Sequence, residues 1–179
     1  MLNTNCEYLR PEIMDVLRAF DREEEELTHY FSYSGGKFYN VIEYGGEFYD
    51  FEDEFNPADD LEYRRYSKRF AKLAFYKVLS KVTGVDLPWG ALTGIRPTKL
   101  AYSELAAGRN FDILFKHMCV SEENTALVGR VLKAQEGLYR EGGQNLYVSL
   151  PFCPTKCDYC SFITAPVEAT KGYLDGYLD

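Results

Sequence analysis

The sequence predicts an α+β fold in which a short antiparallel sheet packs against several helices. Two Gly-Gly pairs, at 35–36 and 45–46, interrupt a stretch rich in Tyr, Phe, Val and Ile, and paired glycines supply the positive φ angles of tight hairpin turns. Apolar residues at three- and four-residue spacing follow, which is the period of an amphipathic helix. A hydrophobic fraction of 46% over 179 residues is ample for a packed core.

We expect a first domain over residues 1–140. Its antiparallel hairpins lie within about 28–55, where aromatic residues alternate with polar ones. Its helices follow, over about 61–82, 97–108 and 121–139. Start signals support all three helices, because Asp59 or Asp60 can cap the first, Pro97 suits the first turn of the second, and Ser121 can cap the third.

The first of these helices is predicted to have an apolar stripe and an opposite basic face. The stripe repeats at three- and four-residue spacing and consists of Ala71, Ala74, Phe75, Val78, Leu79 and Val82. We expect its basic face to balance the acidic sheet. The face consists of Arg65, Lys68, Arg69, Lys72 and Lys77.

Charge is distributed unevenly along the chain. Residues 1–60 carry 16 acidic and 4 basic side chains, or -12, and because the whole chain has a formal charge of -8, residues 61–179 carry +4. An acidic first third disfavours nucleic acid as a partner. The sequence has no apolar run near 18 residues and no signal-peptide pattern, so we expect no membrane association and a cytoplasmic location.

The "EGGQ" stretch at 141–144 is the predicted domain boundary. Residues 141–179 then begin with "NLYVSLPF", which has the pattern of a buried strand. A loop with three cysteines follows, and "EATKGYLDGYLD" starts a helical pattern that the sequence does not complete. We therefore expect a truncated second domain.

The second domain holds three of the five cysteines, Cys153, Cys157 and Cys160, in the spacing C-x3-C-x2-C. Three thiolates on one loop can hold three corners of an iron–sulfur cubane, whereas a structural zinc site usually has four protein ligands. Zinc would need His117 or Cys119 to return in space. A redox pair formed by Cys157 and Cys160 is a third possibility, but it gives Cys153 no role. The remaining thiols, Cys6 and Cys119, are expected to be structural.

An iron without a protein ligand could bind the amine and carboxylate of S-adenosylmethionine. An electron from the cluster would then cleave a carbon–sulfur bond of the sulfonium, and the resulting 5′-deoxyadenosyl radical would abstract hydrogen from a substrate. In this interpretation the protein holds the cluster and S-adenosylmethionine in register and keeps them dry.

The stretch "LYVSLPFCPTKCDYCSF" resembles the motif of the radical S-adenosylmethionine superfamily, and within it the oxygen-independent coproporphyrinogen III oxidases (dehydrogenases). "LPWGALTGIRPTKL" is similar to a segment of longer members that have an extra N-terminal domain. The resemblance implies that residues 141–179 are the first strand, cluster loop and opening helix of a (β/α) barrel. It further implies that this fragment alone would not turn over.

The resemblance also implies roles for individual residues. Cys153, Cys157 and Cys160 would ligate a [4Fe–4S] cluster, and Tyr147 and Tyr159 would lie beside S-adenosylmethionine, although either tyrosine could instead be a packing residue. The implied activity is oxidative decarboxylation of coproporphyrinogen III to protoporphyrinogen IX in haem biosynthesis. An external donor such as a flavodoxin or ferredoxin would supply electrons.

The sequence departs from the family motif at two positions. Some members have histidine at the position of Ser149 and cysteine at that of Phe162, and related members act as haem chaperones, so a haem-binding protein is the alternative function.

Arg96 and Lys99 flank a predicted helix start, where backbone N–H groups favour anions. They could bind substrate propionates, or Arg96 could pair with an acidic side chain in a rigid loop.

Overall fold

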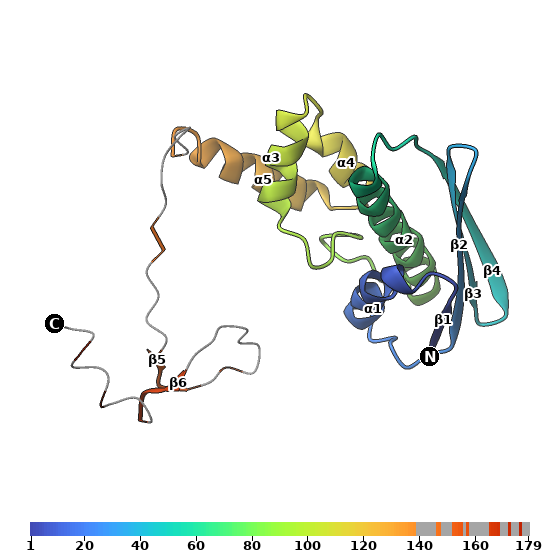
Figure 1. Ribbon diagram of the computed structural model, residues 1–179, viewed down its shortest axis with the longest axis horizontal. Coiled ribbons are helices and arrows are strands. Elements are labelled where there is room, and N and C mark those ends of the chain that lie inside the picture. The colour runs from blue at the N-terminus through green and yellow to red at the C-terminus, as the bar shows by residue number, and fades with distance from the viewer. Residues whose placement is uncertain are drawn as a thin grey trace. The chain divides into compact units, whose positions relative to one another are not determined.

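The structure is a computed structural model that describes residues 1–138, 146–147, 152–155, 157, 165–168, 172 and 176 (Figure 1). The chain divides into two compact units, Met1–Glu136 and Gly137–Asp179. This division falls four residues before the boundary expected from the sequence, and each unit is described by itself below. None of the helices within the described ranges has the length and apolar character that crossing a bilayer requires.

The first unit contains a four-stranded sheet in the order β1-β2-β3-β4. Strands β2 (Leu27–Ser34), β3 (Lys37–Tyr44) and β4 (Glu47–Glu54) are antiparallel neighbours, and the glycine pairs between them all have positive φ. The antiparallel sheet predicted from the sequence is therefore confirmed. The sheet as a whole is mixed, because β1 (Leu2–Thr4) pairs with β2 in parallel, and the sequence analysis did not predict β1.

A buried histidine connects the first three strands of this sheet. His29 on β2 is fully buried. Its Nδ1 lies 2.9 Å from Thr4 Oγ1 on β1, and its Nε2 lies 2.8 Å from Asn40 Oδ1 on β3. Since the amide oxygen can only accept, Nε2 is the protonated nitrogen, and Nδ1 accepts from the Thr4 hydroxyl. Burial lowers the pKa of His29, although the hydrogen bond to Asn40 opposes that effect.

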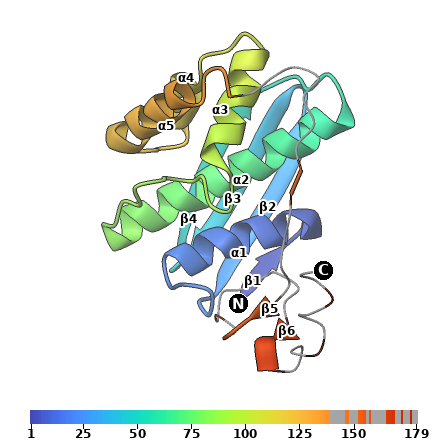
Figure 2. The same ribbon diagram turned by 90° about the vertical axis from the view of Figure 1, so that its left-hand side faces the viewer.

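Two helices cover one face of the sheet, as Figure 2 shows. Helix α1 (Arg10–Ala19) follows the short 3-10 helix η1 (Glu7–Leu9), and the longer α2 (Asp60–Thr83) crosses the sheet beside it. Asp59 caps α2 by accepting from the backbone N–H of Glu62 at 2.7 Å. Between these layers lies a core of fully buried side chains that includes Leu9, Ile13, Leu17, Phe38, Ile42, Phe75 and Leu79.

The remaining helices of the first unit are α3 (Pro97–Ala106), α4 (Phe111–His117) and α5 (Glu122–Ala134). The Ser121 hydroxyl caps α5 by accepting from the backbone N–H of Asn124 at 3.2 Å. Val128 and Leu132 are buried on the inner face of α5, whereas Leu127 and, after the helix ends, Leu138 are 40% and 76% exposed. Helix α4 was not predicted from the sequence.

The structure describes only part of the second unit. Strand β5 (Phe152–Cys153) pairs in parallel with β6 (Ala165–Pro166), with Phe152 opposite Ala165 and Cys153 opposite Pro166. Leu146 and Tyr147 lie outside any strand and are 89% and 79% exposed, so at these two positions the expected buried strand is not present. The expected start of a barrel stays a prediction.

Candidate functional site

The cysteine loop lies between the two short strands of the second unit. Cys153 ends β5 and is half-buried, whereas Cys157 is exposed, and both are free thiols. Cys160 and Tyr159 lie outside the described residues. No group of three His, Cys, Asp or Glu side chains that could hold a metal ion occurs within the described ranges.

Tyr147 is accessible in the described part of the chain. Its side chain is 79% exposed. Tyr147 is therefore not a core residue in this structure, as the alternative from the sequence would have it. An exposed aromatic ring six residues before Cys153 is available to contact a ligand.

Arg96 and Lys99 begin helix α3. Arg96 occupies the N-cap position in extended conformation, with no side-chain hydrogen bond to the helix, and both side chains are exposed. In the part of the chain that the structure describes, Arg96 makes no ion pair. Among the described residues, the loop is therefore not held by an Arg96 ion pair of the kind considered from the sequence.

Lys72 holds this loop in place. Its ammonium donates to the Thr93 carbonyl at 2.8 Å, just before the "GIRP" turn, and it also lies 2.8 Å from Glu12 Oε2 and 3.9 Å from Asp15 Oδ2 on α1. The Lys72 side chain is only 5% exposed. A lysine at this depth is stable when it is paired and hydrogen-bonded, as here.

This arrangement corrects the expectation for the basic face of α2. Lys72 is buried, and Lys68 pairs with Glu12 at 2.7 Å. Both lysines therefore meet carboxylates of α1, not the acidic sheet. Burial alone would raise the pKa of Glu12, but the hydrogen bonds from Lys68 and Lys72 outweigh it, so the pKa lies below its ordinary value. Glu12 is therefore held as a carboxylate.

Arg69, also expected on that basic face, instead lies against α3. Its Nη1 is 4.0 Å from Glu104 Oε1. Glu104 is bound at closer range by Arg109, whose Nε and Nη2 donate to its two oxygens at 2.7 and 3.1 Å. These hydrogen bonds are the main reason that the pKa of Glu104 lies below its ordinary value. Spacing alone gave no signal for this cluster, since its members lie on three separate segments.

Comparison with known proteins supports the resemblance inferred from the sequence. The chain is 34% identical over 120 residues to the oxygen-independent coproporphyrinogen-III oxidase-like protein HemZ of Bacillus subtilis (strain 168). The match covers 62% of this chain and 24% of HemZ, so the chain spans about a quarter of that relative's length. No family model matches the chain. No solved structure matches it either. This match confirms the resemblance to oxygen-independent coproporphyrinogen-III oxidase-like proteins that the sequence motif indicated.

Proposed function

We propose that this chain contributes the cluster-binding segment of a radical S-adenosylmethionine oxidoreductase that acts on a porphyrinogen. The observation on which the proposal depends is the C-x3-C-x2-C spacing of Cys153, Cys157 and Cys160. The similarity to HemZ, an oxygen-independent coproporphyrinogen-III oxidase-like protein, also supports it.

The described residues fit an iron–sulfur cluster in their donor chemistry. Cys153 and Cys157 are free thiols on the segment that leaves β5, and thiolates are the ligands that iron–sulfur clusters use. Cys157 is exposed and Cys153 half-buried, so at least one of the two thiols can be reached from solvent. Cys160 is proposed as the third ligand.

When bound, the cluster and S-adenosylmethionine would supply one-electron cleavage of the sulfonium and the hydrogen abstraction that follows. The protein's own residues would hold these groups. The three cysteine thiolates would bind iron, Tyr147, which is exposed, would lie beside S-adenosylmethionine, and Tyr159 would lie beside the adenine. The specific reaction proposed is oxidative decarboxylation of two propionate side chains of coproporphyrinogen III to vinyl groups, with a flavodoxin or ferredoxin as electron donor.

An anaerobic turnover assay tests this function. The assay uses the full-length polypeptide that contains this sequence, reconstituted with iron and sulfide and supplied with reductant, S-adenosylmethionine and coproporphyrinogen III. We expect 5′-deoxyadenosine and methionine to form in step with loss of the porphyrinogen. Haem binding without 5′-deoxyadenosine formation would instead identify the protein as a haem chaperone and contradict the proposal.

A further inference from the structure

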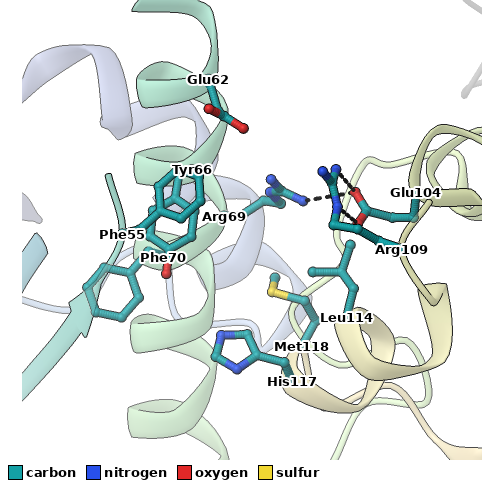
Figure 3. Close-up of a pocket in the computed structure, with 10 residues that line it drawn as sticks. All are labelled: Phe55, Glu62, Tyr66, Arg69, Phe70, Glu104, Arg109, Leu114, His117 and Met118. Carbon is teal, nitrogen blue, oxygen red and sulfur yellow. Dashed lines mark hydrogen bonds and ion pairs between the residues drawn. The ribbon is translucent and has the colours of Figure 1, made fainter. Parts of the chain in front are cut away.

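A pocket of about 160 Å³ lies in the first unit, between α2, α3 and α4 (Figure 3). One wall is aromatic, because the rings of Phe55 and Tyr66 stack with their centroids 4.1 Å apart and their planes 5° from parallel. Phe70, Leu114 and Met118 add further apolar surface. The pocket therefore offers a flat, apolar surface to a small molecule.

The polar lining of the pocket consists of Arg69, Arg109, Glu62, Glu104 and His117, and three of these, Arg69, Glu104 and Arg109, form a cluster. Figure 3 shows Arg69 extending from α2 toward Glu104, which also faces Arg109. Arg109 occupies both oxygens of Glu104, and the 4.0 Å between Arg69 Nη1 and Glu104 Oε1 is too long for a hydrogen bond. The cluster thus has two cations and one carboxylate.

Arg69 has no hydrogen-bond acceptor among the described residues, although its side chain is only 25% exposed. A guanidinium has five N–H donors, and no Arg69 nitrogen is among the fully buried unpaired atoms of the described residues, so these donors face the solvent-accessible pocket and are available to a ligand. Desolvation lowers the pKa of Arg69, and the charge of Glu104 only partly opposes it. The arginine therefore lies in the pocket wall with N–H donors that have no hydrogen-bond acceptor in the part of the chain that the structure describes.

The other acidic side chains near the pocket are already engaged. Glu62 accepts from the backbone N–H of Ala58 at 2.8 Å, next to the start of α2. Asp53 accepts from the Tyr66 hydroxyl at 2.5 Å and lies 3.8 Å from His117 Nε2. Neither carboxylate bonds to Arg69, so an anion from outside the protein would complete the arrangement.

We propose that this pocket binds a small organic carboxylate, with its carboxylate accepting from Arg69 and its short apolar body against the Phe55 and Tyr66 rings. The planar guanidinium fork matches a carboxylate geometrically. An apolar cavity of roughly 150 Å³ can hold a benzene-sized molecule, and such walls favour an organic anion over a strongly hydrated inorganic one. The proposal is independent of the cysteine loop and of the proposed function.

Benzoate is a suitable probe, with benzyl alcohol as a neutral ligand of similar size and inorganic phosphate as a purely inorganic anion. Binding to the 179-residue chain is measured by NMR titration at constant ionic strength, with the Nε–Hε resonances of Arg69 and Arg109 as reporters. We expect benzoate to shift the Arg69 resonance, and benzyl alcohol and phosphate to bind at least tenfold more weakly.

Two matched variants complete the test. R69M keeps the apolar stem and removes the cation, so benzoate should bind it at least tenfold more weakly than it binds the wild type. R65M changes an exposed arginine on the same helix and should bind as the wild type does. Equal affinity of benzoate for R69M and R65M would overturn the proposal, and so would a titration that leaves the Arg69 resonance of the wild type unmoved. The second readout needs no variant to fold.

Discussion

Lys72 Nζ lies 2.8 Å from Glu12 Oε2, so the only strongly buried lysine of the described residues joins helix α2 to helix α1. The same ammonium donates to the Thr93 carbonyl. One side chain thus connects the two helices on the sheet to the loop that leads into α3. The position of Arg96 depends on this connection, because Arg96 follows Thr93 by three residues.

Replacing Lys72 by methionine should destabilise the first unit. The change leaves the Glu12 carboxylate with Lys68 alone and the Thr93 carbonyl without its donor, and removing one partner of a buried pair costs about 2–4 kcal/mol. K68M is the control, since Lys68 is 41% exposed and surface pairs contribute about 1 kcal/mol or less. Urea unfolding followed by circular dichroism measures both. Equal losses in the two variants would contradict the assigned role of Lys72.

The Glu12 carboxylate should make stability depend on acid pH. Its pKa is lowered in the folded state, so its contribution is present above the ordinary glutamate pKa of about 4.3 and is lost as pH falls through the lower folded value. The stability difference between wild type and E12Q should therefore shrink from pH 6 to pH 3. The same comparison with E123Q, on exposed Glu123, should show no such trend. A constant difference for E12Q would be evidence against this pairing.

His29 should produce a second pH effect at higher pH. Its folded pKa is lowered, so the unfolded chain binds the proton more readily, and stability falls as pH drops below the ordinary histidine value of about 6.5. The loss levels off once pH passes below the folded pKa. We expect H29Q to remove most of this decline between pH 7 and pH 5. The free energies of unfolding of the wild type and H29Q, measured across that pH range, test this prediction, and an equal decline in both proteins would contradict it.

Gly90 should not tolerate a side chain. Its φ is +54°, and a Cβ there would lie 2.2 Å from the Met118 carbonyl oxygen and 2.4 Å from the backbone of Cys119. G108A is the matched control, because Gly108 has φ +70° with open space around it and should lose only the roughly 1–2 kcal/mol of a left-handed alanine. We expect G90A to lose clearly more than G108A in thermal unfolding. A similar loss of stability in both variants would mean that Gly90 packs less closely against Met118 and Cys119, just after α4, than described.

The hairpins of the first unit could be predicted from the sequence because their signals are local. Each Gly-Gly pair marks a turn, and the alternation between them sets which face is buried. Strand β1 could not be predicted in this way, because Leu2–Thr4 is short, has no turn beside it and pairs in parallel with β2. Helix α4 was also missed, since its seven residues are too few to show a period.

The helix faces could be predicted only in part. Periodicity correctly placed Phe75 and Leu79 in the core, but it assigned Lys72 to an exposed basic face. Nothing in the spacing indicates that Glu12 and Asp15 approach from a different helix. For the same reason the cluster around Glu104 was not found, because its residues meet only through the tertiary fold.

The cysteines differ from the helix faces, because the metal site was predicted from their spacing in the sequence and not from packing. Cys153 and Cys157 are described as free thiols, and the motif that includes Cys160 stays the basis of the metal prediction. Tyr147, which the motif also singled out, is exposed and outside any strand, contrary to the buried strand that its apolar neighbours indicated.

The most direct test of the central claim is the iron and acid-labile sulfide content of the anaerobically reconstituted 179-residue chain. The account predicts about four of each per chain for the wild type and for C119A, as in a [4Fe–4S] cluster, and loss of most of both in C153A, C157A and C160A. Zinc bound without sulfide, or a cluster that survives the loss of Cys160, would contradict it.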